Sequence, residues 1–482
     1  MIDQNTWEVV VGLEVHAQVI SKTKLFSASS TKFGADANQN TSFIDAAFPG
    51  VLPVLNSFCV DQAIKTGLGI NATINKYSTF DRKNYFYPDL PSGYQITQFF
   101  NPIVSDGYID ITNRRVRIER IHLEQDAGKS VHADGCTMVD LNRAGIALME
   151  IVTHPDMRSA SEAAEFLRRL RAILRALQTC DGNMDEGSIR ADVNVSVRKI
   201  GEELGTRVEI KNVNSIRFLA MAIEYEAQRQ ISILEEGSVI EQATRLFDPA
   251  SGCTKLMRRK EDAEDYRYFP EPDLLPLVLT DERIAAIAEQ MPELPADKIA
   301  RYMNDYGLSE VDAENIALER ENAIYFDACD ILCNSDPTLM KQVANWMLAE
   351  LFAFLNKYGE SIENSRVSPK ELCELVQLIQ NNVISGKIAK DVLERVWNGE
   401  GSPSEIVEKC GLQQVLDTGI IASTVSEVLR ENQQFVEEYK AGKEKLFGFF
   451  VGQIMKKTQG KLNPQMVNDE LRKQLSMETS SE

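Results

Sequence analysis

The sequence lacks any apolar run that approaches the roughly 18 to 20 consecutive residues needed to cross a membrane. Its first residues, MIDQNTWEVVVG, have neither the basic-then-apolar order of a secretory signal nor the Arg- and Ser-rich composition of a transit peptide. We therefore expect a cytoplasmic protein that makes no membrane contact. A hydrophobic content of 43% with 26% charged residues is ordinary for a globular protein.

Paired cysteines are also missing. The eight cysteines are scattered along the chain, and none forms a C-x-x-C pair. They are Cys59, Cys136, Cys180, Cys253, Cys329, Cys333, Cys373 and Cys410. A disulfide framework is not expected in a large cytosolic chain, and a thiolate zinc site needs clustered pairs. We interpret these residues as buried or incidental thiols and predict no structural zinc.

Basic residues are fewer than acidic residues, and the formal net charge is −20. This excess favours solubility and disfavours general attraction to nucleic acid. It does not exclude a nucleic acid, because screening at physiological salt acts over roughly 8 Å and local patches decide binding.

A chain of 482 residues predicts about two to four domains. Alternating segments, Gly/Pro turns and all four histidines occupy the first part, whereas apolar residues three and four apart mark helices from about Pro292 onward. Gly399, Gly401 and Pro403 interrupt that helical pattern. We predict an α+β protein: a largely antiparallel sheet with packed helices in 1–293, an all-α domain in 294–405, and a small C-terminal domain in 406–482. Within the first part, Ser159 and Glu162 form a capping-box pattern ahead of an amphipathic helix.

Several expected strands carry ionisable residues on one face. Acids, histidine and arginine alternate there with apolar residues, as the period of two in a strand requires. These polar positions are Glu14, His16 and Gln18; Arg120, His122 and Glu124; Arg190, Asp192, Asn194 and Ser196; and Arg207, Glu209 and Lys211. Glu150 differs from them, because apolar residues surround it on both faces of its strand.

Two interpretations of these strands remain open. An antiparallel sheet with one face in water would show a similar alternation. A concave functional face is the other, favoured because an unpaired charge such as Glu150 is costly in an apolar run and because buried ionisable groups need partners or a metal. If they converge, the candidate metal ligands offer hard oxygen atoms and one imidazole, which suit Mg²⁺, with Mn²⁺ as an alternative. They are Glu14, His16, Glu124, Glu150 and Asp192. A carboxylate-bound Mg²⁺ near Arg and Lys side chains is what phosphoryl transfer needs.

Two further segments bear on phosphate binding. The segment Asp126–Ser130 ends like a P-loop, but that motif requires glycine where this sequence has Leu123, so we reject it. Lys83 and Tyr85 lie in DRKNYFYPDLPSGYQITQ, where basic residues interleave with tyrosines and can hold phosphates or stack on bases. A packed aromatic loop is the alternative interpretation.

The C-terminal tail is basic. From Lys440 to Lys473 there are eight basic and three acidic residues, a balance of +5 in an acidic chain. Phenylalanines and a glycine precede the lysine pair, and such a segment suits an RNA backbone. The candidate contacts are Lys443, Lys445, Lys456, Lys457 and Lys461. A solvated charged face is the alternative.

These residues lie in motifs that resemble those of the GatB family, the B-type subunit of the aspartyl/glutamyl-tRNA(Asn/Gln) amidotransferase. The motifs occur in family order over essentially the whole chain: VGLEVHAQ, FDRKNYFYPDLP, HLEQDAGKS, VDLNRAGIALMEIV, GSIRADVNVSVR, DYRYFPEPDLLP and, in a YqeY-like tRNA-binding tail, GFFVGQIMKKTQGKLNP.

The resemblance implies an ATP-dependent ligase in protein biosynthesis. It would phosphorylate the side-chain carboxylate of Glu on tRNA(Gln), or Asp on tRNA(Asn), and amidate it. Ammonia would come from the amidase-fold glutaminase subunit, with a further small subunit completing a heterotrimer. The family's metal-ligand motifs match Glu14, His16, Glu124 and Glu150, with Asp192 a further candidate. Lys83, with Tyr85, would contact the phosphates of ATP, and Arg190 would neutralise phosphate charge.

Two departures from the family pattern matter. Gln125 stands where some members carry a second acid, so one ligand would be lost if a member uses it. The paired cysteines of some members are absent between Leu25 and Gly50.

Two other functions remain open: a tRNA-binding scaffold without chemistry, and a stand-alone Mg²⁺-dependent hydrolase or ligase. No amidase Ser-Ser-Lys arrangement can be defended, which favours an obligate partner.

Overall fold

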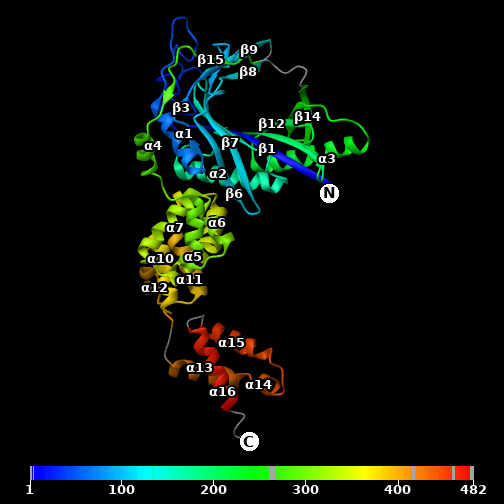
Figure 1. Cartoon of the computed structure of the whole chain (residues 1–482). Helices are drawn as coiled ribbons and strands as arrows, with labels where there is room; N and C mark the ends of the chain where they lie inside the picture. The colour runs from blue at the N-terminus through cyan, green and yellow to red at the C-terminus, as the bar shows by residue number, and fades with distance from the viewer. Residues whose placement is uncertain are drawn as a thin grey trace. The chain divides into compact units, whose positions relative to one another are not determined.

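The computed structural model describes residues 3, 5–133, 135–259, 266–414, 418–458 and 462–477. The chain divides into two compact units, Met1–Asp297 and Lys298–Glu482. The first is a sheet with packed helices and the second is helical, so the α+β prediction is confirmed (Figure 1). The finer division at 293/294 and 405/406 stays a prediction.

A mixed sheet organises the first unit. Within the described residues it has nine strands in the order β14-β13-β12-β11-β1-β10-β7-β6-β2. The strands are β1 (Trp7–Gln18), β2 (Thr73–Ile74), β6 (Val104–Ile111), β7 (Arg114–Gln125), β10 (Ala147–Thr153), β11 (Ile189–Lys199), β12 (Val208–Val213), β13 (Ala243–Asp248) and β14 (Cys253–Arg259). Every neighbouring pair is antiparallel except β12–β13, which is parallel. The largely antiparallel sheet is therefore as predicted.

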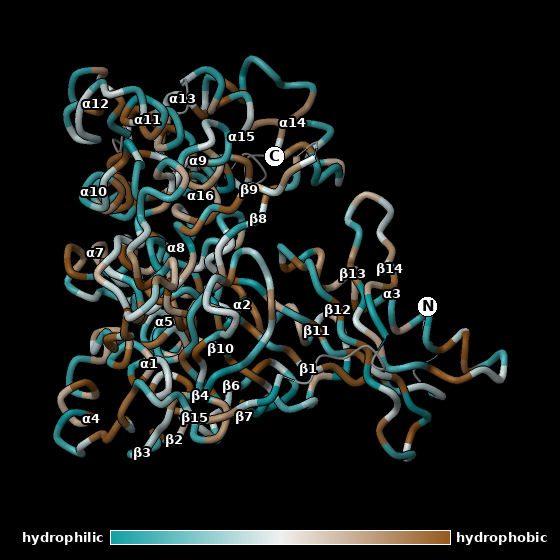
Figure 2. Tube along the Cα trace, turned by 90° about the horizontal axis from the view of Figure 1, so that it is seen from above, coloured by the Kyte–Doolittle hydropathy of each residue, from teal (hydrophilic) through white to brown (hydrophobic). Residues whose placement is uncertain are grey.

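In the described part of the chain, three helices pack on the apolar face of this sheet: α1 (Ser57–Gly69), α2 (Ala160–Leu177) and α3 (Ile216–Glu235). On α2, Phe166, Leu170 and Leu174 are fully buried in the core shared with the strands. Figure 2 shows hydrophobic and hydrophilic residues interspersed along the trace. Because the helices cover one face only, the ionisable residues of the strands gather on the other.

Smaller sheets flank the large one. β4 (Asp81–Asn84) lies between β5 (Tyr94–Thr97) and β15 (Phe269–Pro270), β3 (Tyr77–Ser78) pairs with β16 (Leu277–Val278), and β8 (Lys129–Ala133) pairs with β9 (Cys136–Asp140). The Gly128-Lys129-Ser130 sequence therefore leads into a strand, not into the helix that follows a P-loop. A further helix, α4 (Asp281–Ala288), contacts α1.

The second unit contains two helical groups, each with its own apolar core. The first comprises α5 (Pro295–Tyr306), α6 (Glu310–Ala317), α7 (Arg320–Leu332), α8 (Pro337–Trp346), α9 (Phe352–Tyr358), α10 (Pro369–Gln380), α11 (Gly386–Trp397) and α12 (Pro403–Cys410). A π-helical turn, η2 (Met347–Leu351), joins α8 to α9, and a short 3₁₀ turn, η3 (Ile362–Asn364), follows α9. The second group comprises α13 (Thr418–Glu431), α14 (Gln433–Lys440), α15 (Leu446–Lys457) and α16 (Pro464–Met477). Among the helices of the described residues, none combines the length and hydrophobicity that a bilayer span demands.

The start of α2 tests a local sequence prediction. Ser159 caps the helix by accepting a hydrogen bond from the Glu162 N–H at 3.1 Å. The reciprocal half of the capping box is wrong, because the Glu162 carboxylate accepts from the backbone N–H of Arg158 at 2.7 Å and from Arg114 at 3.1 Å. These two donors satisfy the carboxylate in place of the cap residue.

Removing this cap has a defined cost. We expect Ser159→Ala to lower the free energy of unfolding by about 0.5–2 kcal/mol, since one N–H of the first turn loses its acceptor. Ser232→Ala is the control, because the Ser232 hydroxyl donates to the carbonyl of Gln228 within its own helix and does not cap a helix end. Urea denaturation of both variants measures the difference, and equal midpoints would contradict the assignment.

Candidate functional site

The register of the sheet aligns the ionisable residues in rows. His16 on β1 lies opposite Glu150 on β10, and Glu150 lies opposite His122 on β7. On the other side of β1, His16 faces Arg190 of β11. Directly opposed residues of antiparallel strands project from the same face with Cβ atoms about 4.5–5.5 Å apart. The pairing of β1 with both β10 and β11 therefore brings together residues far apart in the sequence.

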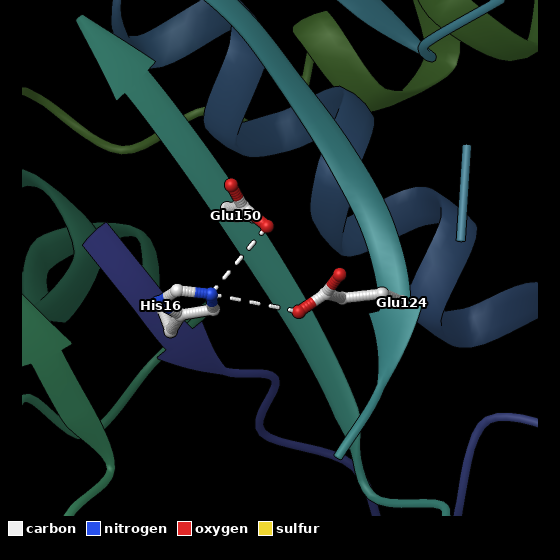
Figure 3. Close-up of side chains that lie close together, drawn as sticks. All are labelled: His16, Glu124 and Glu150. Atoms are coloured by element: carbon white, nitrogen blue, oxygen red, sulfur yellow. Dashed lines mark ion pairs between the residues drawn. The ribbon is translucent and has the colours of Figure 1, made fainter. Parts of the chain in front are cut away.

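Three of these side chains meet at the centre of the polar face. The Nε2 atom of His16 lies 3.4 Å from Glu150 Oε2 and 3.6 Å from Glu124 Oε1. Figure 3 shows them pointing toward one another from β1, β7 and β10. Glu124 is 2% exposed and Glu150 is 8% exposed, so neither carboxylate is a solvated surface group. The alternative of a sheet face open to water does not describe this part of the sheet.

His122 belongs to the same cluster, although it was not among the predicted site residues. Its Nε2 lies 3.2 Å from Glu150 Oε2 and 3.6 Å from Glu124 Oε2, while its buried Nδ1 has no hydrogen-bond partner among the described residues. Burial opposes a charge on this imidazole, but Glu150 and Glu124 outweigh it and raise the pKa of His122 to about 9. The sequence signal was present, since His122 shares a strand face with Glu124.

Glu150 lies between the two imidazoles. Burial acts to raise its pKa, but His122 and His16 prevail and hold the pKa of Glu150 well below its usual range. The pKa of His16 is raised in turn, because Glu150 and Glu124 outweigh its burial. The apolar sequence around Glu150 therefore marks a buried carboxylate stabilised by partners, as expected for a charge in this environment.

Glu14 and Asp192 form the adjacent row and face each other across β1 and β11. Glu14 accepts a hydrogen bond from Asn194 at 2.9 Å, and its pKa is raised by burial and by the charge of Glu150. Asp192 pairs with Lys211, which also lies 2.8 Å from Glu209. Among the described residues, neither Glu14 nor Asp192 joins the group of mutually close donor atoms formed by His16, Glu124 and Glu150.

Lys83 reaches the cluster from the small sheet. Its Nζ lies 4.9 Å from the ring centre of Tyr266 and 5.9 Å from that of Tyr85. Burial disfavours the charge, but Glu124 and other neighbours outweigh it and the pKa of Lys83 is raised. Within the described residues, this ammonium has no hydrogen-bond or ion-pair partner. A cation held in this way is available to a ligand anion.

A pocket of about 400 Å³ connects these groups. Its lining includes Glu14, His16, Lys83, Glu124, Glu150 and Asp192, together with His122, Arg207 and Lys211. Tyr85 and Arg190 are missing from the described residues that line it, although Tyr85 contacts Tyr266 of the lining with ring centres 6.1 Å apart. The pocket is polar, with acids at its centre and basic residues of β12 and β14 toward one side.

Comparison with known proteins decides the family. The description "GatB/GatE catalytic domain" matches residues 9–285, and "GatB domain" matches residues 329–475. The chain is similar to proteins named as the B-type subunit of aspartyl/glutamyl-tRNA(Asn/Gln) amidotransferase. That of Agrobacterium fabrum is 56% identical over 98% of this chain and 95% of the relative, and that of Rickettsia bellii is 54% identical over 97% and 98%. That of Acidiphilium cryptum is 56% identical over 97% of both. The chain belongs to the GatB family.

The family resemblance inferred from the motifs is therefore confirmed. The motif residues Glu14, His16, Glu124 and Glu150 all line one pocket in this GatB-family fold. Donor atoms of His16, Glu124 and Glu150 lie within 4.8 Å of one another, and two buried carboxylates with an imidazole fit a hard divalent cation. This donor set agrees with Mg²⁺ or Mn²⁺, and which residues hold the ion remains a prediction.

Arg190 forms an ion pair within the protein. Its guanidinium donates to Asp126 at 2.8 Å, and Asp126 also lies 3.5 Å from Arg143. Asp126 immediately follows the end of β7, so Arg190 connects β11 to the exit of the strand that carries Glu124. Its predicted role in neutralising phosphate is untested.

The tail lysines are exposed where the structure describes them. Lys443 pairs with Glu438 at 3.0 Å, and Lys457 pairs with Glu427 and Glu431 at 2.9 and 2.8 Å. Lys445 and Lys456 are also exposed, and Lys461 lies outside the described residues. Surface pairs of this kind are weak, so they leave the lysines available to an RNA backbone.

Proposed function

We propose that this chain carries the kinase and amidation site of a tRNA-dependent amidotransferase. It phosphorylates the side-chain carboxylate of Glu on tRNA(Gln), or of Asp on tRNA(Asn), with ATP, and ammonia then converts the activated group to an amide. The observation that carries the proposal is the pocket that combines His16, Glu124 and Glu150 with the ammonium of Lys83, in a chain of the GatB family.

The order of the two steps follows from leaving groups. A carboxylate resists ammonia because oxide would have to leave. In the first step a carboxylate oxygen forms a bond to the γ-phosphorus of ATP, and the bond to ADP breaks. In the second step ammonia bonds to the acyl carbon, inorganic phosphate leaves, and the nitrogen loses a proton to solvent. The acyl phosphate must be kept from water between the steps.

The pocket residues have complementary roles in this proposal. His16, Glu124 and Glu150 would hold Mg²⁺, with Glu14 and Asp192 beside them. The ion supplies charge neutralisation for the phosphates when bound. Lys83 donates to a phosphate oxygen, because its ammonium faces the pocket without a protein partner among the described residues. Tyr85 packs beside Lys83, and Arg190 orients β11 through Asp126.

Partners complete the reaction. Ammonia has to be released from glutamine by the amidase-fold glutaminase subunit, and a further small subunit belongs to the same complex. The lysines of the tail contact the tRNA backbone, and we expect the assembly to act in the cytoplasm. Whether Gln or Asn formation is the physiological task does not alter the roles of the pocket residues.

The dependence of ATP turnover on tRNA tests this proposal. The chain copurified with its glutaminase partner receives Glu-tRNA(Gln), ATP and Mg²⁺ without an ammonia donor. We expect ADP formation with Glu-tRNA(Gln) and only background formation with uncharged or Gln-charged tRNA, which lack the carboxylate. ATP turnover that is the same with all three RNAs would instead support a hydrolase, and no turnover with any of them would support a scaffold.

A further inference from the structure

A left-handed residue lies beside the pocket. Arg267 has φ +45°, in a region that non-glycine residues seldom adopt. Its neighbours Tyr266 and Tyr268 both line the pocket, so this turn determines where two aromatic rings face the site. Uncommon backbone conformations persist only where surrounding contacts hold them, and they concentrate at functional sites.

Among the described residues, the side chain of Asn84 forms hydrogen bonds to this turn. The Nδ2 atom of Asn84 donates to the carbonyl oxygen of Tyr266 at 3.0 Å and to that of Arg267 at 2.9 Å. The backbone N–H of Asn84 also donates to the Tyr266 carbonyl at 2.9 Å. Both carbonyls on either side of the left-handed residue therefore receive their hydrogen bonds from Asn84.

The next residues are anchored separately. Phe269 and Pro270 pair with Arg82 and Asp81 in the small sheet, and Arg82 binds Glu271 through two hydrogen bonds of 2.7 and 2.8 Å. Glu271 is buried, so this bidentate pair fixes the segment after the tyrosines. The side-chain amide of Asn84 therefore acts on a separate feature, the conformation of the Tyr266–Arg267 turn.

The turn positions the surroundings of Lys83. Tyr266 supplies the ring nearest to the Lys83 ammonium, at 4.9 Å. Tyr268 stacks on Phe99 with ring centres 4.0 Å apart and planes within 10°. Asn84 is adjacent to Lys83 on β4, so the strand that presents the ammonium also fixes the rings around it.

We propose that Asn84 is a positioning residue: by clamping the left-handed turn at Arg267, it sets Tyr266 against Lys83 and directs the ammonium toward the phosphoryl group. This inference rests on the proposed function, in which Lys83 contacts phosphate. Asn84 itself touches neither substrate nor reacting atoms. Its effect is therefore expected on the rate of phosphorylation and not on the affinity for tRNA.

The test compares five forms of the copurified complex: wild type, Asn84→Ala, Asn84→Asp, Arg267→Gly, and the double variant of Asn84→Ala with Arg267→Gly. Asn84→Ala is expected to lower kcat for tRNA-dependent ATP turnover about 10- to 100-fold, since a displacement of about 1 Å costs roughly 10²-fold. The KM for Glu-tRNA(Gln) should stay within about twofold of wild type, because the tail and the basic side of the pocket are unchanged.

The Arg267→Gly background tests whether Asn84 acts through the left-handed turn. Glycine adopts positive φ without steric strain, so the turn no longer needs its clamp. In the Arg267→Gly background, removal of Asn84 should lower kcat less than about threefold, a smaller loss than in the wild-type background because the two positions are coupled. Asn84→Asp should be at least as slow as Asn84→Ala, because a carboxylate would face two carbonyl oxygens.

Three results would overturn the inference: Asn84→Ala turning over at the wild-type rate, an equal loss in both backgrounds, or a loss that tracks a lower melting temperature and a higher KM. Failure of the proposed function is distinguishable, because the wild-type complex would then show no tRNA-dependent ATP turnover at all.

Discussion

Glu150→Gln is expected to abolish tRNA-dependent ATP turnover, with a loss of at least about 10³-fold in kcat. The substitution keeps the size of the side chain but removes the charge that lies between His16 and His122 and beside Glu124. Because phosphoryl transfer depends on positioning and charge neutralisation, loss of the buried negative charge of Glu150 should be felt mainly in the transition state. Steady-state ADP formation with Glu-tRNA(Gln) measures it.

Metal binding gives an independent readout of the same variant. A ligand that binds only the folded protein stabilises it by about 2.7 kcal/mol at 100 times its Kd. Millimolar Mg²⁺ or Mn²⁺ should therefore raise the melting temperature of the wild type, and EDTA should reverse this, whereas Glu150→Gln should not respond. Asp110→Asn is the control, since Asp110 forms an exposed pair with Arg115 outside the pocket lining. Equal metal responses in wild type and Glu150→Gln would contradict the ligand assignment.

Lys83→Met is expected to lower kcat about 10²- to 10³-fold, the range observed when one preorganised donor to a developing charge is removed. Methionine fills a similar volume, and the surrounding rings of Tyr85 and Tyr266 accept an apolar side chain. Folding should therefore be preserved, and the melting temperature should be close to that of the wild type. Single-turnover formation of ADP isolates the chemical step from product release.

Lys129→Met is the matched control for Lys83→Met. Lys129 belongs to the Gly128-Lys129-Ser130 sequence, which resembles a P-loop but leads into β8, and its side chain is exposed. We expect this variant to keep its activity within about twofold. A large loss at Lys129 with none at Lys83 would place the phosphates elsewhere and would contradict the site.

The sequence predicted the polar face because strand alternation is a local property. The positions of Glu14, His16 and Glu124 on alternating segments, and of Glu150 within an apolar run, were sufficient to select residues that line one pocket. The helices of the second half could also be predicted from their apolar periodicity. The π-helical turn η2, which joins α8 to α9 within one long apolar pattern, could not. Local periodicity does not reveal such a change in hydrogen bonding.

The register was not predictable from the sequence. His16 faces Glu150 only because β1 pairs with β10, a strand more than one hundred residues later, and no local pattern specifies that pairing. The same limit explains why the sequence does not predict the ion pair between Arg190 and Asp126. The role of Asn84 could not be predicted for a different reason. Its side chain donates to backbone carbonyls, and the residue types in a sequence do not indicate where backbone carbonyls will lie.

The most direct test of the central claim follows an oxygen atom. Glu-tRNA(Gln) labelled with ¹⁸O in the side-chain carboxylate is converted by the complete complex with ATP and glutamine, and the released inorganic phosphate is analysed by mass spectrometry. If the carboxylate attacks the γ-phosphorus, each phosphate carries one ¹⁸O from the substrate. Phosphate without ¹⁸O, formed while Gln-tRNA(Gln) accumulates, would show that ATP is cleaved by water and would contradict phosphorylation of the side chain.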